Sequence, residues 1–147
     1  MLNTFAVVLS LLVSLGAYAQ TAERAAQQQI RASISATYDK AGSKVRTDPI
    51  AVDGDFAVAD WVQGDNGGRA LLQKSKGKWE ITSCGGDSFK DANTLVSAGI
   101  PRATAERLVQ QLGQAEKALS AEQVKRFGLF GTANDPRVRE ARAHHQH

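Results

Sequence analysis

Three closely spaced turn motifs between Lys44 and Cys84 constrain the fold more than any other feature of this sequence. They are Asp53-Gly54, the glycine-rich stretch from Gly64 to Gly68, and the stretch from Lys76 to Lys78. The segments between them, such as FAVADWV and RALLQKS, have the composition of β-strands. Connections this short can join only antiparallel neighbours, because a parallel pair needs a long crossover. We therefore predict a meander of three or four antiparallel strands, with Pro49 restricting the first strand to an edge.

Helical patterns flank this strand region on both sides. Apolar residues recur at four-residue spacing between Thr21 and Lys40, and again at helical spacing between Ala105 and Leu119. Ser120 with Gln123 three residues later has the form of a capping box and predicts another short helix. The order helix, antiparallel meander, helices predicts an α+β domain with the C-terminal helices packed on the sheet.

The first residues, MLNTFAVVLSLLVSLGAYAQ, have the pattern of a secretory signal peptide over residues 1–19. The apolar run from Phe5 to Leu15 is short for a bilayer, and the motif Ala17-Tyr18-Ala19 predicts cleavage after Ala19. An uncleaved membrane anchor is the alternative, because no Lys or Arg precedes the apolar run. We expect a periplasmic protein without stable membrane insertion after cleavage. Residues 20–130 are predicted to form one domain, and residues 131–147 a disordered, histidine-containing tail.

The charge pattern and the histidine content argue against two classes of function. The formal net charge is only +3, and the basic residues are dispersed, whereas a nucleic-acid-binding surface needs clustered Lys and Arg. All three histidines, His144, His145 and His147, lie at the C-terminus. A Ser-His-Asp or Cys-His site would have to recruit them from the predicted tail. The sequence therefore predicts a protein that binds no nucleic acid and is not an enzyme.

Cys84 is the only cysteine, so no intramolecular disulfide can form and no cofactor is expected to be required for folding. A tight turn at Lys76-Gly77 would place Leu72 opposite Ile81 and Arg69 opposite Cys84. Cross-strand partners lie about 4.5–5.5 Å apart at Cβ, and a nearby cation lowers the pKa of a thiol. A three-residue loop would instead shift the pairing by one residue and exchange the faces.

Gly85-Gly86 follow the cysteine and permit a sharp turn of the chain. Such a turn would bring Asp87 near Cys84, where the two groups could share a cation. The alternative interpretation is that Asp87 caps the following helix, since carboxylates are favoured at helix N-termini. For Cys84 itself, the alternative is a small apolar residue buried in a strand.

Several motifs from Ala59 to Ser120 together resemble the copper uptake system-associated proteins, a family of small exported bacterial proteins. The matching positions are Trp61 with Gly64, Gly67-Gly68-Arg69-Ala70-Leu71-Leu72, Gly77 with Trp79, Cys84-Gly85-Gly86-Asp87, and Ala98-Gly99-Ile100-Pro101. The resemblance implies a periplasmic accessory protein of copper uptake or homeostasis, with a periplasmic or membrane component of copper uptake as its partner. It carries over no established metal ligands.

The chemistry of copper limits which residues of this chain could bind it. Cu(I) prefers thiolate and thioether ligands, and Cu(II) accepts imidazole and oxygen. Met1 would leave with the signal peptide, so Cys84 would be the only soft ligand. The candidate metal ligands are Cys84, Asp87, His144, His145 and His147. The alternative function is a metal-free interaction module, for which Leu71, Ala57 and Ala59 suggest partly apolar sheet faces.

Overall fold

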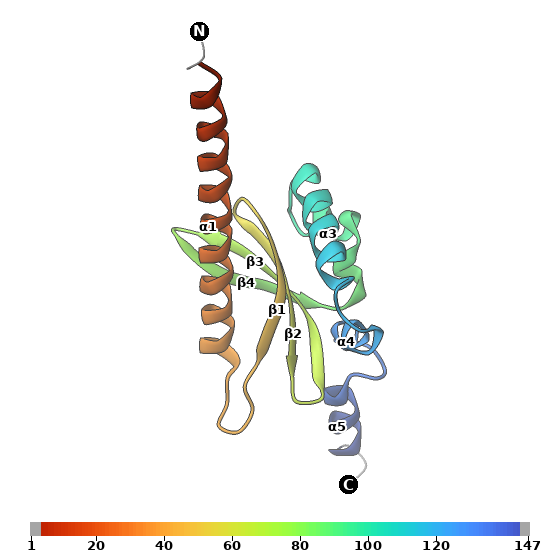
Figure 1. Ribbon diagram of the computed structural model, residues 1–147. Helices are drawn as coiled ribbons and strands as arrows, with labels where there is room; N and C mark the ends of the chain where they lie inside the picture. The colour runs from red at the N-terminus through yellow and green to blue at the C-terminus, as the bar shows by residue number, and fades with distance from the viewer. Residues whose placement is uncertain (1–3, 145–147) are drawn as a thin grey trace.

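A computed structural model describes the backbone of residues 4–144 and the side chains of residues 15–144. It confirms the α+β architecture. A four-stranded antiparallel meander has the strand order β1-β2-β3-β4. Helix α1 covers one face of this sheet, and helices α2 and α3 pack on the other face (Figure 1). The molecule therefore has three layers.

The boundaries of the elements follow the expected turns closely. The strands are β1 Arg46–Asp53, β2 Phe56–Gln63, β3 Asn66–Ser75 and β4 Lys78–Gly85. The helices are α1 Thr4–Tyr38, the 3-10 helix η1 Asp87–Lys90, α2 Ala92–Ser97, α3 Arg102–Glu116, α4 Ala121–Phe127 and α5 Pro136–His144. The capping box of Ser120 and Gln123 is present at the start of α4, as predicted.

Each face of the sheet has its own apolar core. Ile30 and Ile34 of α1 pack with Trp79 and neighbouring residues on one face. Leu108 and Leu112 of α3 belong to the core on the opposite face. The residues that suggested a partner surface are part of these cores: Ala57 and Ala59 are fully buried on the α1 face, and Leu71 is buried on the α3 face. The sheet faces therefore offer no free apolar surface at these positions.

The β3–β4 hairpin confirms part of the predicted pairing and corrects the rest. Ser75 pairs with Lys78 across the two-residue turn, and Leu72 pairs with Ile81, as predicted. Beyond this point a bulge shifts the register, so that Leu71 pairs with Ser83. Arg69 therefore lies opposite Gly85, and the predicted pairing of Arg69 with Cys84 is wrong. A bulge places two residues of one strand against one of its partner, which exchanges the faces beyond it.

Helix α1 begins at Thr4, well before the helix predicted from Thr21. Its first turns extend past the sheet, and Leu15 and Tyr18 are exposed (Figure 1). None of the described helices combines the length and hydropathy needed to cross a membrane. The predicted cleavage after Ala19 would divide α1 and leave Ile30 and Ile34, which form its part of the core, in the exported chain.

The C-terminal segment is more ordered than the sequence suggested. Residues 131–147 were expected to form a disordered tail, whereas helix α5 occupies Pro136–His144. Asp135 is buried and accepts hydrogen bonds from the backbone N–H groups of Gly131 and Arg137. These bonds fix the start of α5. His145 and His147 lie outside the described residues.

Gly67 is a position where the fold has no room for a side chain. A Cβ atom there would collide with the backbone carbonyl oxygen of Arg126 in α4, so one of the two segments would have to move. We expect Gly67→Ala to lower the free energy of unfolding by about 1–3 kcal/mol through overpacking. Urea denaturation followed by circular dichroism measures this change.

Gly113 provides the matched control for this substitution. It lies inside α3, and a Cβ atom there would meet no other atom within 4 Å. Gly113→Ala is expected to stabilise the protein by about 1 kcal/mol, because alanine favours the helix. Equal destabilisation by both variants would show that the close approach of Gly67 and Arg126 does not limit the fold.

Candidate functional site

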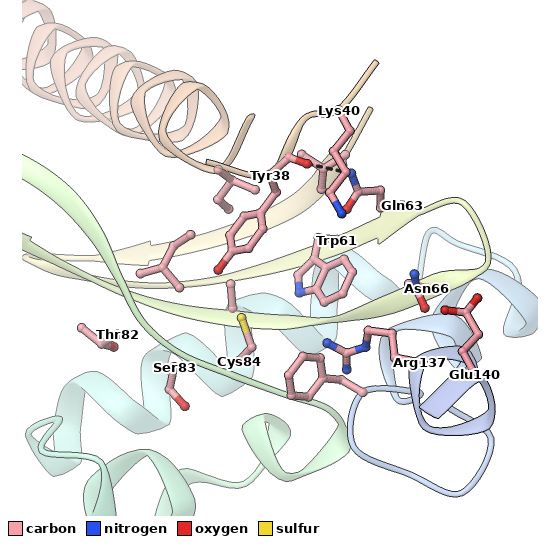
Figure 2. A pocket seen from close by; sticks show the side chains of 15 residues that line it. Tyr38, Lys40, Trp61, Gln63, Asn66, Thr82, Ser83, Cys84, Arg137 and Glu140 are labelled. Carbon is pink, nitrogen blue, oxygen red and sulfur yellow. Dashed lines mark hydrogen bonds between the residues drawn. The ribbon is translucent and has the colours of Figure 1, made fainter. Parts of the chain in front are cut away.

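A cavity of about 610 Å³ lies on the α1 face of the sheet. Its walls come from segments that are far apart in the sequence (Figure 2). The end of α1 contributes Tyr38, the sheet contributes Trp61 and Cys84, and the C-terminal segment contributes Phe130 and Arg137. Protein pockets that bind small molecules usually have volumes of roughly 300–1,000 Å³.

The upper wall in Figure 2 is fixed by the side-chain amide of Gln63. This amide donates hydrogen bonds to the backbone carbonyls of Tyr38 at 2.8 Å and of Ser43 at 2.9 Å. These contacts tie the end of α1 to strand β2. The phenol ring of Tyr38 is thereby held over the cavity, with its hydroxyl group pointing inward (Figure 2).

The opposite wall depends on the C-terminal segment. The ring of Phe130 packs edge-on against Trp61, with 6.1 Å between the ring centroids. The guanidinium carbon of Arg137 lies 4.0 Å from the centroid of the Phe130 ring, and Arg137 also forms an ion pair with Asp135. Hydrogen bonding to Arg137 lowers the pKa of Asp135 to about 2, which keeps this carboxylate ionised. Arg137 is thus held against the cavity by stacking and charge together.

Cys84 contributes the thiol of the cavity, in an environment opposite to the predicted one. Burial raises the pKa of this thiol, and the nearby charge of Arg137 offsets the effect only in part. The predicted lowering by Arg69 does not occur, because the bulge directs Cys84 to the α1 face, where it packs beside Ala70 and its neighbours. At neutral pH the thiol is therefore protonated.

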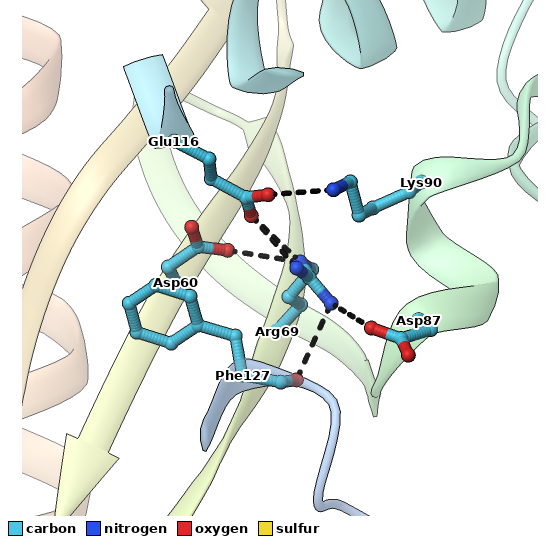
Figure 3. Close-up of polar contacts among 6 residues, drawn as sticks. All are labelled: Asp60, Arg69, Asp87, Lys90, Glu116 and Phe127. Carbon is cyan, nitrogen blue, oxygen red and sulfur yellow. Dashed lines mark hydrogen bonds and ion pairs between the residues drawn. The ribbon is translucent and has the colours of Figure 1, made fainter. Parts of the chain in front are cut away.

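Arg69 is instead the centre of a buried ionic cluster on the other face of the sheet (Figure 3). It donates hydrogen bonds to Glu116 at 2.8 and 3.1 Å and to Asp87 at 3.0 Å. Its guanidinium group also donates to the backbone carbonyl of Phe127 at 3.4 Å and lies over the ring of that residue. The cluster joins strand β3 to η1, α3 and α4.

Asp60 completes this cluster as a neutral carboxyl group. Its Oδ1 atom lies 3.1 Å from Arg69 Nε, yet it accepts no hydrogen bond there, because the Nε proton is directed at Glu116. Burial, together with the adjacent Glu116, raises the pKa of Asp60 to about 9. Burial alone would raise the pKa of Glu116 too, but hydrogen bonds with Asp60, Lys90 and Arg69 lower it. Asp60 therefore stays protonated beside ionised Glu116.

Several residues of the motif Cys84-Gly85-Gly86-Asp87 serve this packing. A Cβ atom on Gly85 would lie about 3.0 Å from the Phe89 ring, and one on Gly86 would lie 2.9 Å from the carbonyl oxygen of Gly128. Asp87 pairs with Arg69 although 81% of its side chain is exposed. It is the first residue of η1, where no side chain caps the helix. Asp87 is therefore neither a cap nor a neighbour of the thiol.

The predicted metal ligands are accordingly separated in the fold. Cys84 faces the cavity, Asp87 faces the Arg69 cluster, and His144 ends α5 with its side chain exposed. Within residues 15–144, no group of three or more His, Cys, Asp and Glu side chains is arranged to hold a metal ion. His145 and His147 lie beyond that range. The structure thus provides one candidate soft ligand, in a cavity that offers it aromatic, apolar and cationic neighbours.

Sequence reasoning missed Tyr38, Phe130 and Arg137 as parts of a site, and it assigned Trp61 only to the core. A helix start signal was available, because Asp135 before Pro136 is a favourable N-cap followed by a favourable first helical residue. Comparison with protein-family models, curated proteins and solved structures yields no match. The function must therefore be inferred from the cavity and from the motif resemblance.

Proposed function

We propose that this chain is a periplasmic, non-catalytic binding protein whose binding site is the Cys84 cavity. The observation that carries this proposal is the cavity itself, which has the size of a small-molecule site and is lined by Tyr38, Trp61, Cys84 and Arg137. A nucleophilic cysteine needs a lowered pKa or an adjacent base. The raised pKa of Cys84 supports binding rather than catalysis.

The resemblance in sequence motifs supports copper handling as the setting of this function. Cu(I) favours thiolate ligands, and Cys84 is the only thiol in the chain. A single thiol is an incomplete site, and within the described side chains Cys84 belongs to no group of three or more His, Cys, Asp and Glu residues that could hold a metal ion. A Cu(I) ion at Cys84 would therefore take its remaining ligands from outside those residues, as expected of an accessory protein that works with a copper-carrying partner.

An anaerobic Cu(I) titration against a competing chelator tests this proposal. We expect the reduced protein that begins at Gln20 to bind Cu(I), its Cys84→Ser variant to lose this binding, and its variant ending at Ala143 to retain it. The truncated variant separates a thiol site from chelation by the C-terminal histidines. If the variant ending at Ala143 loses Cu(I) binding and Cys84→Ser retains it, the C-terminal histidines bind the metal and Cys84 is not a ligand.

A metal-free binding module is the second candidate function. The observation that favours it is the protonated state of the thiol, because a metal ion would first have to displace the proton. If no form of the protein competes with the chelator for Cu(I), the function of a Cu(I) carrier is excluded. The cavity then remains the binding site of a metal-free protein.

A further inference from the structure

We propose that the Cys84 cavity binds a small organic anion, a carboxylate carried on an apolar body, with Trp61 and Arg137 recognising the carboxylate. This inference rests on the proposed function, since it names the ligand class of the same cavity. Three features support this inference: the arrangement of hydrogen-bond donors, the position of the acidic residues and the apolar surface beside the donors.

The first observation is that donors converge on one part of the cavity. Figure 2 shows the guanidinium group of Arg137, the indole nitrogen of Trp61 and the hydroxyl group of Tyr38 directed toward the region beside Cys84. The Nε1 atom of Trp61 is buried and has no hydrogen-bond partner among the described residues. An indole N–H and a guanidinium group can only donate hydrogen bonds. A ligand held by both must present acceptors, and a carboxylate does so with a compensating charge.

The second observation concerns the capacity of Arg137 for a ligand. Its Nε and Nη2 atoms bind Asp135, whereas its Nη1 atom donates no hydrogen bond among the described residues. Asp135 and the Phe130 ring fix the plane of the guanidinium group. Arg137 lines the cavity with one amino group that has no partner among the described residues, and its fixed position reduces the entropy lost when a ligand binds.

The acidic residues near Arg137 lie outside the region proposed to hold the ligand carboxylate. Asp135 is the ion-pair partner of the guanidinium group and does not line the cavity. Glu140 also lines the cavity, but it lies with Asn66 on the side away from Cys84 (Figure 2). Lys40 adds a second positive charge to the lining. The region enclosed by Trp61, Cys84 and the guanidinium group thus contains donors and no carboxylate.

The third observation is an apolar surface next to these donors. Ile34 of α1, Val45, Ala70 of β3 and Ile81 of β4 line the same cavity. Burial of alkyl groups on such a surface favours binding. The combination of an apolar wall and a cationic, donor-rich wall suits an amphipathic carboxylate better than inorganic phosphate, which has no apolar part.

Nuclear magnetic resonance titration with octanoate and 1-octanol tests this proposal, because the two compounds share the same alkyl body. The protein has two tryptophans, and Trp79 does not line the cavity, so its indole signal is an internal control. We expect octanoate to shift the Trp61 indole N–H signal in a saturable manner. 1-Octanol should bind about tenfold more weakly, because it lacks the charge-assisted hydrogen bonds.

Arg137→Gln and Arg139→Gln form a matched pair of variants on α5. Arg137 lines the cavity and Arg139 does not. We expect Arg137→Gln to weaken octanoate binding about tenfold while leaving 1-octanol binding unchanged, and Arg139→Gln to alter neither. Ala70→Leu, which fills the cavity from the sheet, should weaken both compounds and serves as a second test if Arg137→Gln disturbs α5.

The outcomes separate this inference from the proposed function. Equal affinity for octanoate and 1-octanol would overturn the preference for an anion and leave the cavity as a binding site. No shift of the Trp61 signal by octanoate would overturn the inference itself. Absence of Cu(I) binding by every form in the titration described above would exclude a Cu(I) carrier without affecting the anion, since the two experiments use different probes.

Discussion

Replacing Arg69 with methionine is expected to lower the free energy of unfolding by about 3–5 kcal/mol, because it leaves the buried carboxylate of Glu116 without its main cation. Arg69 is completely buried and is the only described residue that contacts Asp60, Asp87 and Glu116 together. Methionine has a similar length, so the loss is one of charge and hydrogen bonds rather than of volume. Urea denaturation of the purified protein measures the change.

Arg107→Met is the control, because Arg107 also forms an ion pair through two hydrogen bonds, with Asp53, but its side chain is 54% exposed. A surface pair of this kind contributes about 1 kcal/mol or less. Adding Glu116→Gln to Arg69→Met should restore part of the lost stability, since it removes a buried charge that has lost its main partner. Similar effects of Arg69→Met and Arg107→Met would contradict the role of the buried cluster.

Asp60→Asn is expected to stabilise the protein increasingly as the pH rises from 5 to 8. The pKa of Asp60 is about 9 in the folded protein and 3.8 in an ordinary environment. The folded state therefore holds one proton more than the unfolded state across this interval, and its stability falls by roughly 1 kcal/mol per pH unit. Asparagine can donate a hydrogen bond to Glu116 without binding that proton. Thermal or urea denaturation at several pH values measures the difference between the variant and the wild type.

Asp53→Asn provides a control of opposite sign. The hydrogen bond from Arg107 lowers the pKa of Asp53, so this carboxylate adds stability above its ordinary pKa and loses it as the pH falls. Asp53→Asn should therefore destabilise the protein near neutral pH, and the difference should disappear in acid. A pH-independent effect of Asp60→Asn would mean that Asp60 is already ionised in the folded protein.

The strand order could be predicted from the sequence because its determinants are local. Gly54 and Gly77 have positive φ angles of 58° and 77° and lie in the β1–β2 and β3–β4 turns, respectively. Residues with positive φ are needed in short hairpin turns, and glycine adopts such angles at little cost. The apolar face of α1 could also be predicted from local sequence, because Ile30 and Ile34 lie one helical turn apart on the face that meets the sheet.

The environment of Cys84 could not be predicted, because it depends on a single β-bulge in β4. The pairing is regular from Ser75 to Leu72 and shifts between Leu72 and Leu71. No glycine or proline in the segment EITS marks this bulge. Since side chains alternate between the faces, this single shift moves Cys84 away from Arg69 and toward α1.

The ionic cluster and the cavity were missed for a different reason. Arg69 and Glu116 are 47 residues apart, and neither has a local pattern that predicts their contact. Arg137 reaches the cavity only because Asp135 is buried and starts α5. The lack of apolar periodicity in this segment predicts a disordered tail, whereas its packing depends on the carboxylate of Asp135 and the ring of Phe130.

The C-terminal wall of the cavity also links ligand binding to the completion of folding. The sheet and α1 form one half of the site, and Phe130 and Arg137 of the C-terminal segment form the other half. A ligand that contacts both halves binds only the docked state and shifts the docking equilibrium toward it by mass action. Occupancy of the cavity would then appear as slower amide hydrogen exchange in α5, a helix with no buried residue of its own.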